Sequence, residues 1–181
     1  MKKKSDKERI LILGASGFIG NALYKELCNY FITFGTFRTN KKSYENNHHF
    51  FQYGMEKDDI FDVLETVKPT IIISALRGDF SSQVIVHQHL CEYLLQFDAK
   101  LIFLSSANVF DAYSKYPSYE FDKTLSHSVY GHFKIKIENM LLRLPKKQVL
   151  ILRLPMVFGT SSPRVNALKL FLKEQLPIEI F

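Results

Sequence analysis

The order of apolar segments along the chain predicts an α/β fold, in which a doubly wound parallel sheet carries helices on both faces. Three observations lead to this prediction. Short runs of β-branched and other apolar residues alternate with stretches whose apolar residues recur at helical spacing. A glycine-rich turn follows the first of these runs. No internal repeat or low-complexity linker divides the 181 residues, a length that suits one domain with a real core.

The first half of the chain is expected to contain four strands and two helices. The run at residues 9–13 is short, apolar and ended by a glycine, and the run at 70–75 is nearly all β-branched or small, as in buried strands. Phe18, Leu23 and Leu27 recur at helical spacing, and Pro69 stops the second helical pattern. The expected strands are residues 9–13, 31–37, 49–53 and 70–75, and the expected helices are 17–29 and 58–67.

The second half continues the alternation. Apolar runs at residues 100–105 and 149–154 are expected to be strands. The stretch at 82–97, which precedes the first of these strands, has the amphipathic pattern of a helix. Strands that alternate with helices in this way favour parallel pairing through right-handed crossovers. The expected helices are residues 82–97, 126–144 and 164–176.

Composition excludes several function classes. A net charge of +6 is dispersed along the chain without a nucleic-acid-binding module, so no nucleic-acid partner is expected. No apolar run approaches the ~20 residues of a membrane span. The two cysteines imply no disulfide framework, which favours a cytoplasmic protein. His87 and His89 are about 200° apart around a helix and cannot easily share an ion, so no metal site is expected.

The turn after the first strand has the pattern of a phosphate-binding loop. Gly14 permits a tight turn, Gly17 allows backbone N–H groups to approach a pyrophosphate, and Gly20 allows the helix to pack close to the strand. The amino end of the following helix would add oriented amides for the phosphates. A dinucleotide site is therefore predicted here, with Ser16, Phe18 and Ile19 as further contacts.

The end of the second expected strand indicates which dinucleotide would bind. An acidic residue usually holds the ribose 2′-hydroxyl of NAD at this place. The stretch at residues 35–40 contains no Asp or Glu but has Arg38, whose guanidinium suits a 2′-phosphate. The sequence thus favours NADP(H) over NAD(H).

Tyr130 and Lys134 are candidate catalytic residues. They are four residues apart in an expected helix and therefore share one face. An ammonium group nearby would lower the phenol pKa from about 10 and make Tyr130 a usable acid or base. Ser106 follows a strand at the sheet edge where ligands bind, and its hydroxyl is placed to hydrogen-bond a substrate carbonyl.

Taken together, these motifs resemble the extended short-chain dehydrogenases/reductases, and most closely the dTDP-4-dehydrorhamnose reductase group with its epimerase and dehydratase relatives. The resemblance covers about the whole chain. It rests on Gly14-x-x-Gly17-x-x-Gly20, the Leu-Ser-Ser-Ala-Asn-Val-Phe run at 104–110, Tyr130-Gly131-x-x-Lys134 with Glu138, and Arg153-x-x-x-Val157-Phe158-Gly159.

The resemblance implies a Rossmann-like domain that transfers hydride between NAD(P) and a nucleotide-linked sugar, with 4-keto sugar reduction favoured over epimerisation. It implies that Tyr130 donates the proton, that Lys134 lowers its pKa and binds ribose, and that Ser106 positions the carbonyl. Ser74, Ala75 and Leu154 would also contact the cofactor. A homodimer through the helices at 82–97 and 126–144 is implied as well. A catalytically inactive dinucleotide sensor or interaction module is the alternative.

The sequence departs from the family pattern in three places, the first being Gly54-Met55 where relatives commonly have an aspartate that contacts adenine. The usual Asn-Ala-Ala run after the fourth strand is replaced by Ser74-Ala75-Leu76, followed by Arg77-Gly78-Asp79. Relatives also continue beyond the last expected helix into a substrate-binding region. Residues 8–160 are therefore expected to form the cofactor core of a single domain, and 161–181 the start of a largely absent substrate-binding part.

Overall fold

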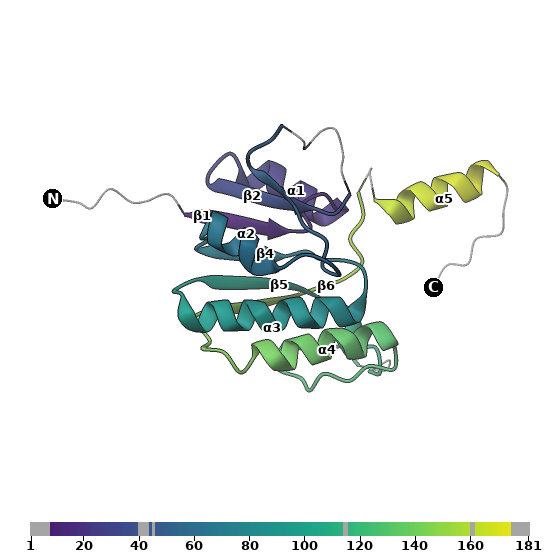
Figure 1. Ribbon diagram of the computed structural model, residues 1–181. Helices are drawn as coiled ribbons and strands as arrows, with labels where there is room; N and C mark the ends of the chain where they lie inside the picture. The colour runs from purple at the N-terminus through teal and green to yellow at the C-terminus, as the bar shows by residue number, and fades with distance from the viewer. Residues whose placement is uncertain (1–7, 40–43, 45, 114–115, 160–161, 175–181) are drawn as a thin grey trace.

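A six-stranded parallel sheet forms the centre of the computed structural model, which describes residues 8–39, 44, 46–113, 116–159 and 162–174 (Figure 1). The strand order is β3-β2-β1-β4-β5-β6. Successive strands are therefore added on one side of β1 as far as β3 and on its other side from β4 onward. The carboxyl ends of β1 and β4 flank the crevice where ligands bind in such sheets. The elements are β1 (Arg9–Leu13), α1 (Phe18–Leu27), β2 (Ile32–Phe37), β3 (Phe50–Gln52), α2 (Ile60–Val67), β4 (Ile71–Ser74), α3 (Phe80–Gln96), β5 (Lys100–Ser106), the short 3-10 helix η1 (Ala107–Phe110), α4 (Val129–Leu141), β6 (Val149–Leu154) and α5 (Pro163–Lys173).

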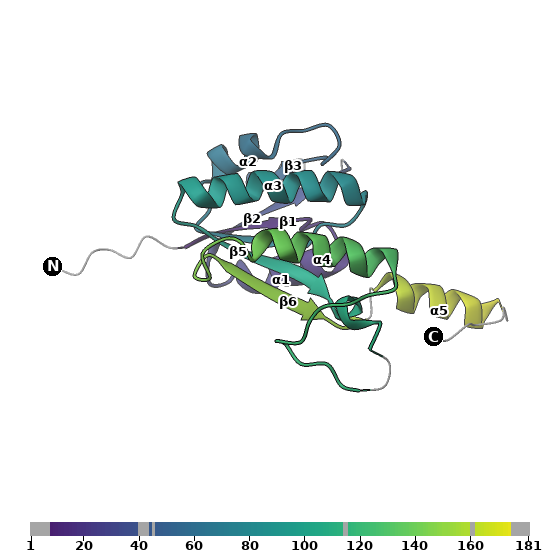
Figure 2. The same cartoon turned by 90° about the horizontal axis from the view of Figure 1, so that it is seen from below.

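Successive residues of a strand point to opposite faces of the sheet and pack into two separate hydrophobic cores. Leu11 and Leu13 of β1 face the layer formed by α2, α3 and α4, whereas Ile10 and Ile12 face α1 (Figure 2). Helices therefore cover both faces, and the predicted doubly wound α/β fold is confirmed. Within the described residues, α1 is the helix packed on the second face, and Leu150 of β6 remains 51% exposed there.

Every expected strand and helix is present; the strand ends differ by one residue at most, and the larger differences lie at the helix ends. Gly17 has an extended backbone and precedes α1, which shortens the helix predicted for residues 17–29. Asp79 caps α3 and starts it at Phe80, two residues before the predicted start. Ser128 caps α4, so the predicted start at residue 126 lies in the preceding loop. The helix η1 was not predicted.

The carboxyl-terminal helix α5 lies beyond the end of β6, apart from the layers of the domain (Figures 1 and 2). Four of its apolar side chains are exposed to solvent. No helix in the described part of the chain is both long and apolar enough to cross a membrane. The exposed apolar residues of α5 are Leu168, Leu170, Phe171 and Leu172.

Candidate active site

The glycine turn between β1 and α1 is closed by backbone contacts that exclude side chains. Gly14 has a φ of +81°, and a Cβ there would lie 2.8 Å from the carbonyl oxygen of Ala75, at the end of β4. A Cβ on Gly20 would collide with the Gly14 carbonyl oxygen. The N–H of Gly14 donates to Thr36 Oγ1 at 2.8 Å, which ties the turn to β2. The turn therefore brings the ends of β1, β2 and β4 together.

The amino end of α1 is left without an internal anion. Gly17 provides no side-chain cap, and the first turn of the helix contains no acidic residue. The Ser16 N–H donates to the Thr36 carbonyl oxygen at 3.3 Å, whereas Phe18 and Ile19 lie in the first helical turn, where N–H groups have no intrahelical acceptor. These two amides face the position that the phosphates of a dinucleotide occupy in this fold. The residues present fit such a group.

Arg38 lies at the end of β2, as the sequence indicated, but it is paired. Its Nη2 is 3.2 Å from Glu56 Oε1, and the two side chains are 63% and 31% exposed. Gly78, after β4, approaches the same guanidinium, since a Cβ on Gly78 would lie 3.8 Å from Arg38 Nη1. Glu56 was not identified from the sequence because it follows a different strand, β3.

Ser106 ends β5 and serves as the cap of η1. Its hydroxyl donates to Asn108 Oδ1 at 3.0 Å and accepts from the Asn108 N–H at 3.2 Å. It also lies close enough to the hydroxyl of Tyr130 to lower the pKa of that phenol. Leu154, at the end of β6, pairs in register with Ser106 and therefore lies beside it at the sheet edge.

A glycine in α4 allows Tyr130 to reach this edge. A Cβ on Gly131 would overlap Ser126 Oγ and lie 2.5 Å from the Asn108 carbonyl oxygen. Without a side chain, the first turn of α4 packs directly on η1. Asp111 strengthens the same junction by accepting from the His127 N–H at 2.6 Å. Gly131 is thus needed for this close packing, which places the phenol of Tyr130 next to Ser106.

Lys134 is buried beneath Tyr130. Its Nζ donates to the Leu104 carbonyl oxygen at 3.0 Å and lies 5.7 Å from the centre of the Tyr130 ring. It also lies 4.6 Å from the centre of the Phe103 ring. Burial lowers the pKa of Lys134 to about 8, although Glu138 opposes the shift. The three predicted catalytic residues therefore converge at the carboxyl end of β5.

The environment of the Tyr130 hydroxyl has opposing effects on its acidity. Burial raises its pKa above the ordinary value, and the positive charge of Arg77 and the hydrogen bond with Ser106 lower it. The lowering charge thus comes from Arg77, a residue that the sequence motifs did not identify, while the ammonium of Lys134 lies under the ring.

A buried ion pair fixes α4, which carries Tyr130 and Lys134, to the sheet. Arg153 of β6 donates to Glu138 through Nε and Nη2, the latter at 2.9 Å, and Ser105 Oγ donates to the same carboxylate at 2.5 Å. Glu138 is 1% exposed. A third donor of Arg153 reaches the Glu120 carbonyl oxygen at 2.8 Å, which anchors the loop before α4. The motif residues Glu138 and Arg153 thus hold α4 in place.

Ser74 is held by a buried histidine. The Ser74 hydroxyl lies 3.0 Å from His87 Nε2, and His87 Nδ1 lies 2.6 Å from the Gln83 carbonyl oxygen. A carbonyl only accepts, so Nδ1 carries the proton and Ser74 donates to Nε2 of the neutral ring. His87 is fully buried, and burial lowers its pKa to about 4. Among the described residues no cluster of metal-ligating side chains occurs.

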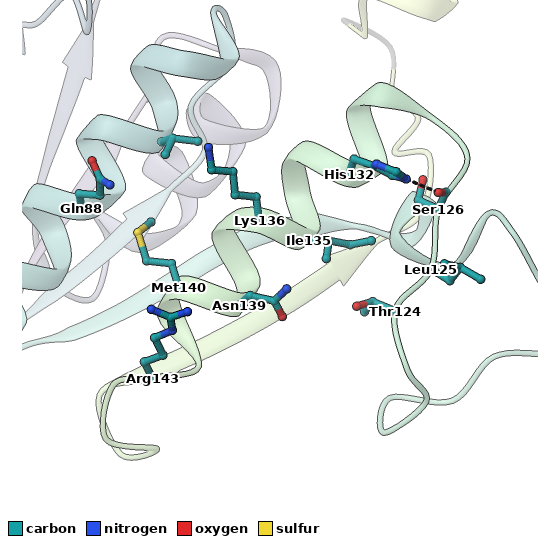
Figure 3. A pocket seen from close by; sticks show the side chains of 11 residues that line it. Gln88, Thr124, Leu125, Ser126, His132, Ile135, Lys136, Asn139, Met140 and Arg143 are labelled. Carbon is teal, nitrogen blue, oxygen red and sulfur yellow. Dashed lines mark hydrogen bonds between the residues drawn. The ribbon is translucent and has the colours of Figure 1, made fainter.

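Two hollows lie near this constellation without containing it. One, of about 430 Å³, lies between α1 and the segment after β6 and is lined by Phe18, Ile19 and Val157 to Gly159. The other, of about 590 Å³, lies between α3, α4 and residues 124–126 (Figure 3). Its lining includes Gln88, His132, Lys136, Met140 and Arg143.

The sequence and the fold were compared with those of known proteins. A curated dTDP-4-dehydrorhamnose reductase from Aggregatibacter actinomycetemcomitans is 28% identical over an aligned length of 163 residues, and the match covers 83% of this chain and 52% of the relative. A solved dTDP-glucose 4,6-dehydratase from Bacillus anthracis, in complex with NAD, superposes with a TM-score of 0.77 at 16% identity, covering 93% of this chain and 61% of that one. A hypothetical dTDP-4-dehydrorhamnose reductase from Sulfolobus tokodaii gives 0.74 at 19%, covering 89% and 60%.

These comparisons confirm the resemblance inferred from the motifs. The chain spans about half the length of the curated relative that it matches. The solved structures are too distant in sequence to show more than the fold. The model of the NAD dependent epimerase/dehydratase family matches residues 10–172, from the first strand into α5. Because that match covers most of the chain, the protein belongs to this family.

Proposed function

We propose that the protein is an NAD(P)-dependent oxidoreductase that acts on a nucleotide-linked sugar, with reduction of a 4-keto group favoured over epimerisation. One observation carries the proposal: Ser106, Tyr130 and Lys134 meet at the sheet edge next to the glycine turn. The curated relative is named as a dTDP-4-dehydrorhamnose reductase, which supports the choice of reduction.

Each residue has a distinct part in the proposed reaction. A reduced nicotinamide, when bound, supplies the hydride to the carbonyl carbon. Ser106 hydrogen-bonds the carbonyl oxygen, exchanging its present contact with Asn108 for the substrate. Tyr130 donates the proton to that oxygen, which completes the alcohol. Lys134 has one of its three donors on Leu104, and its remaining donors are assigned to the ribose hydroxyls.

The glycine turn and its neighbours are proposed to hold the cofactor. Gly14, Gly17 and Gly20 shape the turn, and the amides of Phe18 and Ile19 are assigned to the phosphates, with Ser16 beside them. Ala75 and Leu154 line the crevice at the ends of β4 and β6, and the Ser74 hydroxyl, which donates to His87, has only acceptor capacity left. Arg38 is assigned to a 2′-phosphate, so NADP(H) is preferred.

The proposal extends to the domain division, the assembly and the location of the protein. Residues 8–160 are proposed as the cofactor core and 161–181 as the beginning of a substrate-binding part. A homodimer is proposed through the outer faces of α3 and α4, where Ile85, Leu95 and Leu142 are exposed. The two free cysteines suit a reducing compartment, and we propose a cytoplasmic location.

The direct test measures oxidation of NADPH in the presence of a panel of nucleoside-diphosphate 4-keto sugars. Tyr130→Phe removes the proton donor and leaves the ring contacts with Phe80 and Phe133, so it is expected to lower kcat by a factor of about 10² or more. Cofactor binding by the same variant should stay within about threefold. Tight cofactor binding without turnover of any sugar in the panel would instead support the dinucleotide-sensor alternative.

A further inference from the structure

The hollow between α3 and α4, of about 590 Å³, contains none of the residues proposed for catalysis or for the cofactor (Figure 3). Val84 and Gln88 of α3 line one side of it, and α4 lines the other. Residues 124–126, from the loop before α4, line one end. A concave site of this size is large enough for a small organic ligand.

Three residues that can carry positive charge lie in a row on the α4 side of the hollow. His132, Lys136 and Arg143 follow one another at intervals of four and seven residues, which places them within about 40° of one another around the helix. Leu142, just after α4, keeps a helical backbone, so the row continues to Arg143. Asn139 lies in the same row and adds amide N–H donors. Among the described residues that line the hollow, none is Asp or Glu.

The positive charges of this row are not neutralised within the described part of the chain. Neither Lys136 nor Arg143 forms an ion pair there, because the two ion pairs of those residues lie elsewhere. Glu138, the buried carboxylate of α4, is already neutralised. The ring of His132 is held by a hydrogen bond from Nε2 to the Ser126 carbonyl oxygen. The hollow therefore presents a fixed ring and two unpaired cations to a ligand.

The spacing and the lining of the hollow indicate a diphosphate joined to an apolar ring. Lys136 and Arg143 are two helical turns apart, about 10 Å along the axis, which suits two linked phosphates better than one. Both side chains can donate charge-assisted hydrogen bonds to phosphate oxygens. Met140 lies between them and offers a thioether, which packs well on aromatic rings (Figure 3). Val84 and Ile135 add further apolar surface.

We propose that this hollow is a second ligand site, which binds a nucleoside diphosphate with its phosphates on Lys136 and Arg143 and its base against Met140. The inference goes beyond the proposed function and does not depend on it, because no residue that lines the hollow is assigned to the reaction.

The proposed homodimer is compatible with such a site. Leu95 and Leu142, exposed on the proposed dimer surface, lie seven residues beyond Gln88 and Ile135 and therefore border the hollow. An isologous contact pairs a surface with itself. A homodimer through this face would thus bring the cations of two copies together, which increases the requirement for an anion.

The test follows binding residue by residue in the full chain. The isotope-labelled protein is titrated with uridine diphosphate and, separately, with inorganic pyrophosphate, and NMR records the backbone amide signals. Uridine diphosphate is expected to shift the signals of residues 132–143 until they saturate, and to bind at least about threefold more tightly than pyrophosphate. The signals of residues 16–19 report binding at the glycine turn separately, and the whole spectrum shows whether each variant is folded.

The variants divide the proposed contacts. Lys136→Gln combined with Arg143→Gln should weaken uridine diphosphate binding by about tenfold or more, because charge-assisted hydrogen bonds to the phosphates are lost. Met140→Ala should weaken binding of uridine diphosphate and leave that of pyrophosphate within about twofold. The matched control is Lys146→Gln combined with Lys147→Gln, which removes the same charge from two exposed lysines outside the hollow and should change the affinity by less than about twofold.

Several outcomes would overturn the proposal. Equal weakening in the two double variants would show attraction by net charge alone, and shifts confined to residues 16–19 would place the ligand in the crevice. Pyrophosphate that binds as tightly as uridine diphosphate would refute the nucleoside. A dimer in sedimentation whose signals at 132–143 respond to neither probe would show that a second copy covers the hollow. Binding at the hollow by a protein that reduces no nucleotide sugar supports the second site and refutes the proposed function.

Discussion

In the proposed cofactor site, the preference for NADPH over NADH is expected to depend on a competition for Arg38. In the free protein, Arg38 pairs with Glu56 at 3.2 Å, and both side chains are substantially exposed. Binding of NADPH would require the guanidinium to exchange this carboxylate for the 2′-phosphate. The perturbations are Arg38→Ala, which removes the phosphate partner, and Glu56→Gln, which removes the competitor and its negative charge.

The expected change in binding free energy depends on the exposure of the ion pair and on the type of hydrogen bond that replaces it. An exposed ion pair is worth about 0.2–1 kcal/mol, whereas charge-assisted hydrogen bonds to a phosphate contribute about 1.5–3 kcal/mol. The exchange should therefore favour NADPH by about 1–2 kcal/mol, or about 5- to 30-fold in Kd. Arg38→Ala should remove this preference and leave the Kd for NADH within about twofold. Glu56→Gln should tighten NADPH binding by about two- to fivefold.

The assay is a fluorescence titration with each reduced cofactor. The chain contains no tryptophan, so energy transfer from its nine tyrosines to the nicotinamide is recorded. Lys146→Ala is the matched control for loss of an exposed positive charge. Equal weakening of NADPH and NADH in Arg38→Ala would refute the assignment of the 2′-phosphate. Tighter binding of NADH than of NADPH by the parent protein would refute the preference itself.

Three further predictions concern stability. Arg153→Met leaves the buried carboxylate of Glu138 with Ser105 as its remaining side-chain donor, so urea denaturation should show a loss of about 3–5 kcal/mol; a loss below about 1 kcal/mol would contradict the anchoring role. Gly131→Ala forces α4 away from η1 and should cost about 1–3 kcal/mol and also lower kcat; parent-like stability and turnover would show that the contact is not needed. His87 has a folded-state pKa of about 4, below its ordinary 6.5, so protonation favours unfolding and about 3 kcal/mol should be lost as the pH falls from 6.5 to 4. Denaturation of His87→Gln at both pH values should show a smaller loss, and an equal loss would place the acid sensitivity elsewhere.

Most of the fold was predictable because its signals are local. The run at residues 9–13 and the run at 149–154 were predicted with the bounds that β1 and β6 have, since each is a short and mostly apolar run, buried in β1 and partly exposed in β6. Helix ends were predicted less well. The start of α3 depends on which of several polar residues turns its side chain back on the helix, and Asp79 was one of several candidates before Ser82.

The parts of the candidate site that form local motifs could also be predicted, whereas contacts between distant parts of the chain could not. The glycine turn and the Ser106, Tyr130 and Lys134 set could be proposed from motif spacing, because each motif occupies one short stretch of chain. The partners that modify them come from other elements, as Glu56 beside Arg38 and His87 beside Ser74 show. Such pairs depend on strand order and loop course, which the sequence pattern does not encode locally.

The charged groups of the site form two sets, one buried on the inner side of α4 and one exposed along the crevice. The carboxylate of Glu138 is buried on the inner side of α4, where Arg153 neutralises it. The same carboxylate raises the pKa of Lys134 and so partly opposes the lowering caused by burial. Along the crevice, the helix amides and Arg77 face the solvent without carboxylate partners among the described residues, and Arg38 exchanges its exposed partner easily. A crevice with this polarity suits the phosphates of a dinucleotide, because they gain stability from positive charge that the protein itself does not neutralise. Burial, by contrast, keeps the pKa of Tyr130 above its ordinary value.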